Sequence, residues 1–204
     1  MADEPRPGRG EALAELTAQA LGSLSEGVVT VSDQTRSMAP LLQGGERLRW
    51  RRPAGTPRRG ELVVFAGAPG LVVHRVVRRR AGVLTTKGDA RPAADVEHVA
   101  TSAVIGVVDA IETGAAVTSL RGGGARFYAA LATAISLGGA GLYRVAALGD
   151  GALRRLLLRR EGRAWLRRPA GWVQFGLQAL LHALLFRACH RRAAFAAALP
   201  EKSR

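Results

Sequence analysis

The stretch ELVVFAGAPGLVVHRVV, residues 61–77, contains two apolar runs separated by a short connector. Valine is frequent in both runs, Glu61–Phe65 and Leu71–Val77, and β-branched residues favour strands. The connector, Gly67-Ala68-Pro69-Gly70, has the composition of a turn. These residues therefore predict two β-strands joined by a turn-rich segment.

Further short strands are predicted on both sides of this stretch by β-branched or alternating apolar residues. They are Val28–Val31, Glu46–Arg51, Val83–Thr86, Val104–Ile111 and Ala115–Leu120. The last two flank Thr113-Gly114, which predicts a hairpin. Many short strands with Gly and Pro between them indicate a mainly β protein with a compact, partly closed antiparallel fold.

Composition and charge divide the 204-residue chain into three parts. Residues 1–27 begin as a polar segment and continue into Glu11–Glu26, where leucines at helical spacing predict a short amphipathic helix. Residues 28–122 form the predicted β domain. From the first residue to residue 122 the chain carries 16 Lys or Arg and 13 Asp or Glu, a net charge of +3. The remaining residues, 123–204, form a basic tail with 14 Lys or Arg and 3 Asp or Glu, a net charge of +11.

The basic tail is expected to be helical. Its two apolar segments, Phe127–Leu148 and Trp172–Phe186, flank the arginine-rich stretch Arg154–Arg168. A helix that spans a bilayer needs about 20 apolar residues, and glycines and Arg144 interrupt the first segment. The second segment carries one polar stripe, formed by Gln174, Gln178 and His182. Both features disfavour helices that cross a membrane.

We therefore expect the tail helices to lie on an anionic membrane surface, held by their arginines, in a membrane-associated and otherwise cytoplasmic protein. The alternative is a soluble helical pair that packs on the β domain. Lipid is favoured over nucleic acid because the basic residues are not interleaved with aromatics and no nucleic-acid motif is present. The amino-terminal residues lack the apolar core of a secretory signal or anchor, so neither is expected.

Metal and cofactor chemistry finds little support in the sequence. Cys189 is the only cysteine, which excludes an internal disulfide and a cysteine-based metal site. Gly122-Gly123-Gly124 lacks the lysine of a phosphate-binding loop and is interpreted as a linker. No metal and no other cofactor is therefore predicted.

A hydroxyl, an imidazole and two carboxylates in the β domain could together form a hydrolytic site. Ser37 precedes Pro40, which restricts the nearby backbone, and His74 interrupts an apolar strand. Asp89 and Asp95 follow in a turn-rich segment. Each has an ordinary explanation by itself: a loop serine, a core histidine and turn-capping aspartates. Lys87, another candidate base, is expected to be exposed. The order of nucleophile, base and acid differs from that of chymotrypsin-like, subtilisin-like and esterase-like enzymes.

Short motifs in this region resemble those of the signal peptidase I family, the serine endopeptidases that remove signal peptides. Ser37-Met38-Ala39-Pro40 is similar to the family's Ser-Met-x-Pro box, and Gly45-Glu46 and Arg59–Phe65 are similar to the Gly-Asp positions that follow it. Val73-His74-Arg75-Val76 matches the segment with the general base, and Lys87-Gly88-Asp89 matches a Lys-Gly-Asp box. Histidine as the base and the Lys-Gly-Asp box are features of the endoplasmic-reticulum and archaeal-type branch.

The resemblance implies a β fold of the signal peptidase type over about residues 28–112 and assigns catalytic roles. Ser37 would be the nucleophile and His74 its general base. Asp95 would orient His74, and Asp89 would be a nearby supporting carboxylate.

The resemblance also implies an oxyanion and substrate-binding segment around the nucleophile. The backbone N–H of Ser37 would donate to the oxyanion, the hydroxyl of Thr35 would be a second donor, and Met38 belongs to the same segment. Arg36 stands where many relatives have Gly, and Glu46 and Glu61 replace the family's aspartates.

The sequence therefore predicts a serine endopeptidase that cleaves a signal-peptide-like or other membrane-proximal peptide after small residues. The alternative is a catalytically inactive module of the same fold that binds a peptide or another protein. A self-cleaving regulator of the phage-repressor type is disfavoured, because the chain has no recognisable DNA-binding domain and has His in place of Lys as the base.

Overall fold

The computed structural model describes most of the chain between residues 16 and 156 and a short part of the tail. The described residues are 16–17, 19–34, 36–67, 70–91, 93–156, 172–173, 175–177 and 179–180. Thr35, the polar stripe Gln174, Gln178 and His182, and Cys189 lie outside them.

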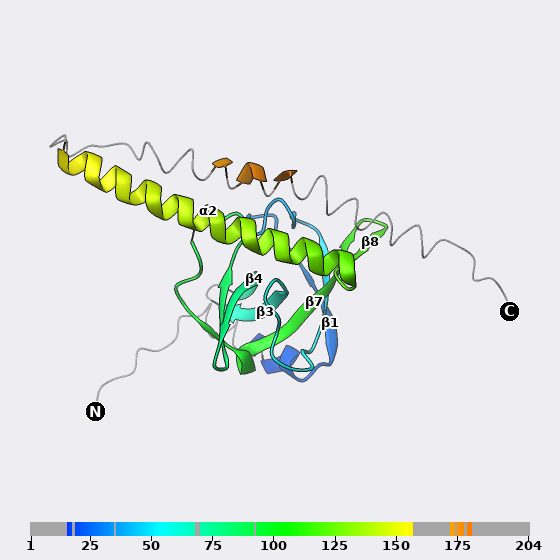
Figure 1. The fold of residues 1–204 in the computed structure, drawn as a ribbon. Coiled ribbons are helices and arrows are strands. Elements are labelled where there is room, and N and C mark those ends of the chain that lie inside the picture. Colours follow the sequence, from blue (N-terminus) through cyan, green and yellow to red (C-terminus); the bar gives the residue numbers. More distant parts are fainter. Residues whose placement is uncertain are drawn as a thin grey trace, which may run out of the picture.

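Eight strands form one antiparallel sheet (Figure 1). They are β1 Glu26–Thr30, β2 Arg47–Arg51, β3 Leu62–Gly67, β4 Gly70–Arg80, β5 Val83–Lys87, β6 Val99–Ala100, β7 Val104–Thr113 and β8 Ala116–Ser119. The strand order is β1-β2-β7-β3-β4-β5-β6, and β8 pairs with β7. The prediction of a mainly β, antiparallel protein is confirmed, and the sheet is open rather than closed on itself.

The stretch from residue 61 to residue 77 forms the β3–β4 hairpin. Its two strands pair from Leu62 opposite Arg75 to Gly67 opposite Gly70, so the predicted connector closes the hairpin. The predicted hairpin around Gly114 is also present, as β7 paired with β8. β4 continues through three arginines to Arg80, beyond the apolar run that indicated it.

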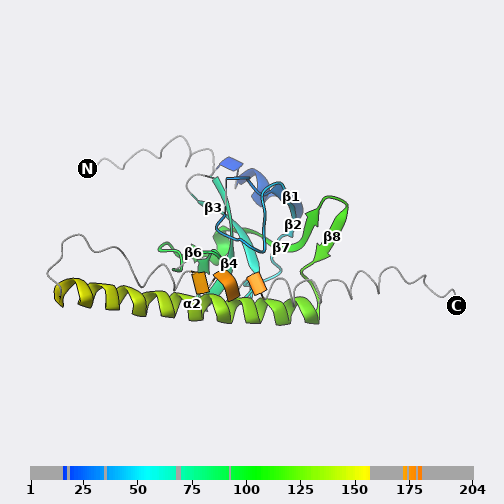
Figure 2. The same cartoon turned by 90° about the horizontal axis from the view of Figure 1, so that it is seen from above.

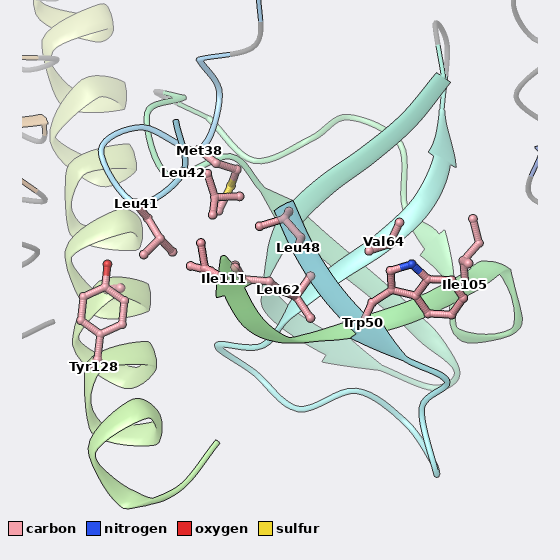
Figure 3. Close-up of a cluster of buried hydrophobic side chains, with 12 residues drawn as sticks. Met38, Leu41, Leu42, Leu48, Trp50, Leu62, Val64, Ile105, Ile111 and Tyr128 are labelled. Atoms are coloured by element: carbon pink, nitrogen blue, oxygen red, sulfur yellow. The ribbon is translucent and has the colours of Figure 1, made fainter. Parts of the chain in front are cut away.

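The two faces of the sheet bury two separate apolar clusters, because side chains alternate along each strand. Leu62 and Val64 of β3 belong to the first cluster, and Val63 and Phe65 belong to the second. The first cluster, drawn in Figure 3, comprises Met38, Leu41, Leu42, Leu48, Trp50, Leu62, Val64, Ile105, Val108, Ile111, Tyr128 and Ala132. The second comprises Val63, Phe65, Val76, Leu84, Val99, Val104 and Val107.

The long helix α2, Gly123–Leu156, covers the face that holds the first cluster (Figure 2). Tyr128 and Ala132 of its first turns are buried in that cluster. Its far end extends past the sheet (Figure 1). The change of composition near residue 122 therefore marks the start of a helix whose first turns share the core of the β region. The interpretation of Gly122-Gly123-Gly124 as a linker is therefore wrong for two of its residues, because Gly123 and Gly124 are the first residues of α2.

The amino-terminal helix ends before Glu26, the end of the predicted range, and residues 11–15 lie outside the described residues. Of the described residues, 16–17 and 19–22 are helical, and β1 begins at Glu26. The Ser23 hydroxyl donates to the Ala20 carbonyl oxygen, one of the carbonyl groups that lack an intrahelical partner at the end of a helix. Leu21 packs against the first cluster, as expected for a helix docked on the core.

Within the described part of the chain, no helix combines the length and the apolar character needed to cross a membrane.

Trp50 lies at the centre of the β1–β2–β7 region, where two glycines allow the backbone to approach its ring. Gly27 is directly opposite Trp50 in β1, and Gly106 of β7 faces the other part of the indole. A Cβ atom at Gly106 would lie 2.8 Å from Cδ2 and 3.1 Å from Cβ of Trp50. These distances leave no room for a methyl group.

Gly106→Ala is therefore expected to lower the free energy of unfolding by about 1–3 kcal/mol, the usual effect of overpacking a filled core. Gly138→Ala in α2 is the control, because a Cβ there meets no atom within 4 Å. Chemical denaturation of both variants measures the effect. Equal stability of Gly106→Ala and Gly138→Ala would contradict the packing described for Trp50.

Candidate active site

Ser37 is positioned by the apolar residues that follow it. It lies in a turn between β1 and β2, and its side chain is half-buried. Met38, Leu41 and Leu42 are buried in the first cluster, and the Leu42 N–H donates to the Met38 carbonyl oxygen over 3.1 Å. The turn is therefore fixed to the sheet directly after the serine.

His74 of β4 lies beside the Ser37 hydroxyl. Its Nε2 is 3.1 Å from Ser37 Oγ, and its Nδ1 is 2.6 Å from Asp95 Oδ2. The ring is buried and meets Phe65 edge to face. When Nδ1 donates to the carboxylate, Nε2 is left as an acceptor for the serine proton. This is the geometry of a serine nucleophile, its general base and an orienting acid.

Asp95 is fixed by two hydrogen bonds to β5. Thr86 Oγ1 donates to Asp95 Oδ2 over 2.7 Å, and the Asp95 N–H donates to the Thr86 carbonyl oxygen over 2.9 Å. Burial acts to raise the pKa of Asp95, but the hydrogen bonds from His74 and Thr86 outweigh it and lower the pKa below its ordinary value. Asp95 is therefore a carboxylate at neutral pH and can stabilise a positive charge on His74.

Asp89 lies on the opposite side of β4 from this group and pairs with Arg75. Arg75 Nε donates to Asp89 Oδ1 over 2.8 Å and Nη2 donates to Oδ2 over 2.6 Å. Arg75 Nη1 also donates to the Gly60 carbonyl oxygen over 2.9 Å, and its guanidinium lies 5.8 Å from the centre of the Tyr128 ring. Both members of the pair are buried. Burial acts to lower the pKa of Arg75, but Asp89 outweighs it and the pKa is raised.

The turn that carries Asp89 is packed against the backbone of Ser37. The Ala90 N–H donates to the Ser37 carbonyl oxygen over 2.9 Å. A Cβ at Gly88 would lie 2.6 Å from that oxygen and 3.0 Å from Ser37 Cβ, so only glycine permits this approach. The Arg75–Asp89 pair thus anchors a turn that supports the serine, while the two aspartates have different positions and different partners.

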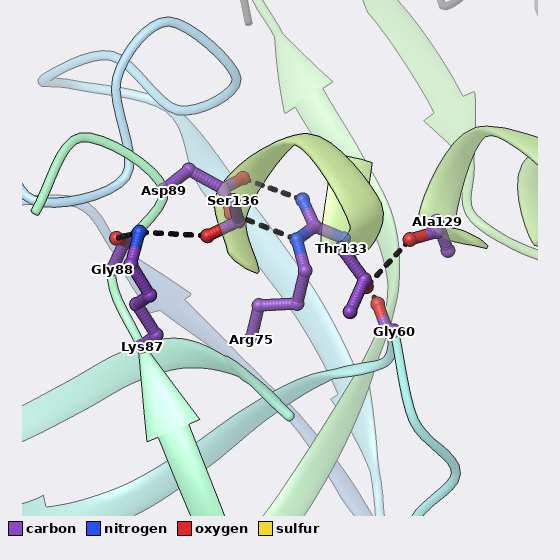
Figure 4. Close-up of polar contacts among 8 residues, drawn as sticks. All are labelled: Gly60, Arg75, Lys87, Gly88, Asp89, Ala129, Thr133 and Ser136. Atoms are coloured by element: carbon purple, nitrogen blue, oxygen red, sulfur yellow. Dashed lines mark hydrogen bonds and ion pairs between the residues drawn. The ribbon is translucent and has the colours of Figure 1, made fainter. Parts of the chain in front are cut away.

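Lys87 is buried, so the expectation that it is exposed is wrong. Its Nζ donates to Ser136 Oγ of α2 over 2.7 Å and to the Gly88 carbonyl oxygen over 3.4 Å (Figure 4). Burial lowers its pKa to about 8, and the nearby carboxylates of Asp89 and Asp95 offset part of that effect. Lys87 points to the helix and not to Ser37, and no hydrogen bond joins it to the serine.

The remaining predicted site residues are Met38 and Thr35. The Met38 side chain is 4 % exposed and packs in the first cluster, so its observed contacts are those of a core residue. Thr35 lies outside the described residues. Among the residues that the structure describes, no three His, Cys, Asp or Glu side chains gather closely enough to hold a metal ion.

Sequence reasoning missed Thr86, Arg75 and Ser136 as parts of the site. A signal for Thr86 exists in the sequence, because it falls on the same face of its short strand as the buried Leu84. No comparable local signal exists for Ser136, which lies 49 residues from Lys87 along the chain.

No protein-family model matches this chain, and no curated protein matches it. The assignment of a function therefore depends on the geometry of these side chains.

The buried Lys87 predicts a pH dependence of stability. Its pKa is about 8 in the folded protein and 10.5 for an ordinary lysine, so the unfolded chain binds more protons between these values. The free energy of unfolding should therefore rise between about pH 8 and pH 10, and Lys87→Met should remove this rise. Urea denaturation of both proteins over this range measures it. The range ends at pH 10 because burial raises the pKa of Tyr128 to about 12, which has the opposite effect at higher pH. Equal slopes in wild type and variant would contradict a buried lysine.

Proposed function

We propose that the protein is a serine endopeptidase of the signal peptidase I type that cleaves a signal-peptide-like or other membrane-proximal peptide after small residues. The observation that supports this most directly is the alignment of Ser37 Oγ, His74 Nε2, His74 Nδ1 and Asp95 Oδ2, at 3.1 Å and 2.6 Å. A loop serine, a core histidine and a turn aspartate have no reason to meet in this order.

The proposed reaction begins when Ser37 Oγ attacks the scissile carbonyl carbon and His74 Nε2 takes the hydroxyl proton. The imidazolium that forms is stabilised by the Asp95 carboxylate. The tetrahedral oxyanion would accept hydrogen bonds from the Ser37 N–H and, by resemblance to the family, from the Thr35 hydroxyl.

Collapse of this intermediate breaks the carbon–nitrogen bond, and His74 returns its proton to the leaving amine. A water molecule then attacks the ester on Ser37, with His74 again as the base, and releases the carboxylic acid product. Every proton moved in this cycle passes through one imidazole, so the orientation of His74 limits the rate of both halves.

The second candidate is a module of the same fold that binds a peptide or another protein without cutting it. Arg36 is exposed directly before Ser37, where it could obstruct the approach of a substrate. The hydrogen-bonded Ser37, His74 and Asp95 favour the enzyme, because binding alone needs no activated hydroxyl.

Ser37→Ala should reduce the cleavage of a peptide with small residues before the scissile bond by about 10³-fold or more, and Asp95→Asn should have a loss of similar order. Ser102→Ala is the control, because Ser102 is exposed and takes no part in the hydrogen bonds that join Ser37, His74 and Asp95. Product formation followed by mass spectrometry measures each rate. Equal residual activity in wild type and Ser37→Ala would leave the binding module as the better proposal.

We also propose that the protein lies against an anionic membrane surface. The side of α2 away from the sheet exposes Phe127, Leu137, Val145 and Leu148, which is unusual for a helix that faces only water. Arg126 and Arg144 of the same helix are exposed as well. Exposed apolar and cationic groups on one helix are the combination that binds an anionic lipid surface.

Val145→Asp combined with Leu148→Asp should weaken binding to vesicles of phosphatidylglycerol and phosphatidylcholine by about tenfold or more, because two apolar side chains are lost from the interface. Val96→Asp is the control, since Val96 is also exposed but lies in a loop of the sheet region. Cosedimentation at low and high salt measures binding, and high salt should weaken it. Deletion of the whole tail is unsuitable because Tyr128 and Ala132 belong to the core. Equal cosedimentation of the two variants would contradict the proposal.

A further inference from the structure

Helix α2 is connected to the nucleophile by an unbroken series of contacts. Ser136 accepts a hydrogen bond from Lys87 Nζ at 2.7 Å. Lys87 is followed directly by Gly88 and Asp89, which Arg75 fixes on the other side. The next residue, Ala90, donates its N–H to the Ser37 carbonyl oxygen. Only the Gly88–Ala90 turn therefore separates the contact with α2 from the backbone of Ser37.

Ser136 differs from its buried neighbour on the same helix. Thr133 is also buried, but its hydroxyl donates to the Ala129 carbonyl oxygen within α2. Ser136 is fully buried and its hydroxyl bonds across to β5 (Figure 4). Thr133 thus satisfies its own polar group locally, whereas Ser136 forms a polar contact between the helix and the sheet.

Burial of the Lys87 ammonium group costs free energy, which indicates that this residue has a structural role. Its ammonium loses hydration, and a leucine or methionine would fill the same space without that penalty. The hydrogen bond to Ser136 and the contact with the Gly88 carbonyl oxygen hold its stem in one conformation. The backbone at Lys87 and Gly88 is consequently held at a fixed distance from α2.

We propose that Ser136 and Lys87 are positioning residues, through which docked α2 holds the Gly88–Ala90 turn against Ser37. The expected effect on kcat rests on the proposed endopeptidase activity, whereas the expected effect on the position of the Gly88–Ala90 turn does not. A displacement of about 1 Å between a nucleophile and its base can lower the rate about 10²-fold, and Ser37 Oγ and His74 Nε2 are already 3.1 Å apart. Loss of the Ser136 contact is expected to allow such a displacement.

The experiment compares Ser136→Val with Ser136→Thr, which have nearly the same shape and differ in the hydroxyl. Ser136→Val should lower kcat about tenfold with KM unchanged, and should speed hydrogen exchange of the Ala90 amide about tenfold, as for the loss of a hydrogen bond to a charged group. Ser136→Thr should retain both values near those of wild type. Thr133→Val is the matched control and should change neither, because its hydroxyl bonds only within the helix.

Equal values for Ser136→Val and Ser136→Thr in both measurements would overturn the inference. If the wild type cleaves no peptide, the proposed function fails, and Ala90 exchange still decides whether the helix positions the turn. If Ser136→Val does not fold, Lys87→Met removes the same hydrogen bond from the other side. A Lys87→Met protein with wild-type kcat and wild-type Ala90 exchange would also overturn the inference.

Discussion

The ion pair between Arg75 and Asp89 is the constraint on which the rest of the site depends. A buried guanidinium without its carboxylate leaves an uncompensated charge, which destabilises a protein by about 3–5 kcal/mol. The pair is bidentate, and the third contact of Arg75, to the Gly60 carbonyl oxygen, fixes the guanidinium in one orientation. The ion pair therefore fixes the Asp89 side chain to β4, while the Lys87–Ser136 hydrogen bond holds the start of the same turn against α2.

Strand β4 carries His74 and Arg75, whose side chains lie on opposite faces of the sheet. His74 and Arg75 are adjacent, so alternation directs the imidazole toward the second cluster and the guanidinium toward α2. One face holds the hydrogen-bonded series of Ser37, His74 and Asp95. The other face holds the charges that fix the supporting turn. Because the hydrogen bond from Ala90 to Ser37 joins the two faces, the ion pair orients the serine without contacting the base.

Local patterns in the sequence predicted the strands, since apolar alternation and turn composition are local properties. The β3–β4 and β7–β8 hairpins were predicted for this reason. The roles of Ser37, His74 and Asp95 came from the resemblance to a peptidase family, because the residues by themselves did not distinguish Asp89 from Asp95 as the partner of His74. Lys87 was predicted wrongly because its burial depends on a helix that begins 36 residues later, at Gly123. The docking of Tyr128 on Arg75 and of Ser136 on Lys87 depends on packing between distant segments, which no local period encodes.

The central claim is that Ser37 is an activated nucleophile, and covalent labelling tests it most directly. Full-length protein is treated with a fluorophosphonate, digested, and mapped by mass spectrometry. Our account predicts one phosphonyl adduct, on Ser37, that forms far more slowly in a His74→Ala protein. Labelling that is absent, that falls on other serines, or that proceeds equally fast without the imidazole would contradict it.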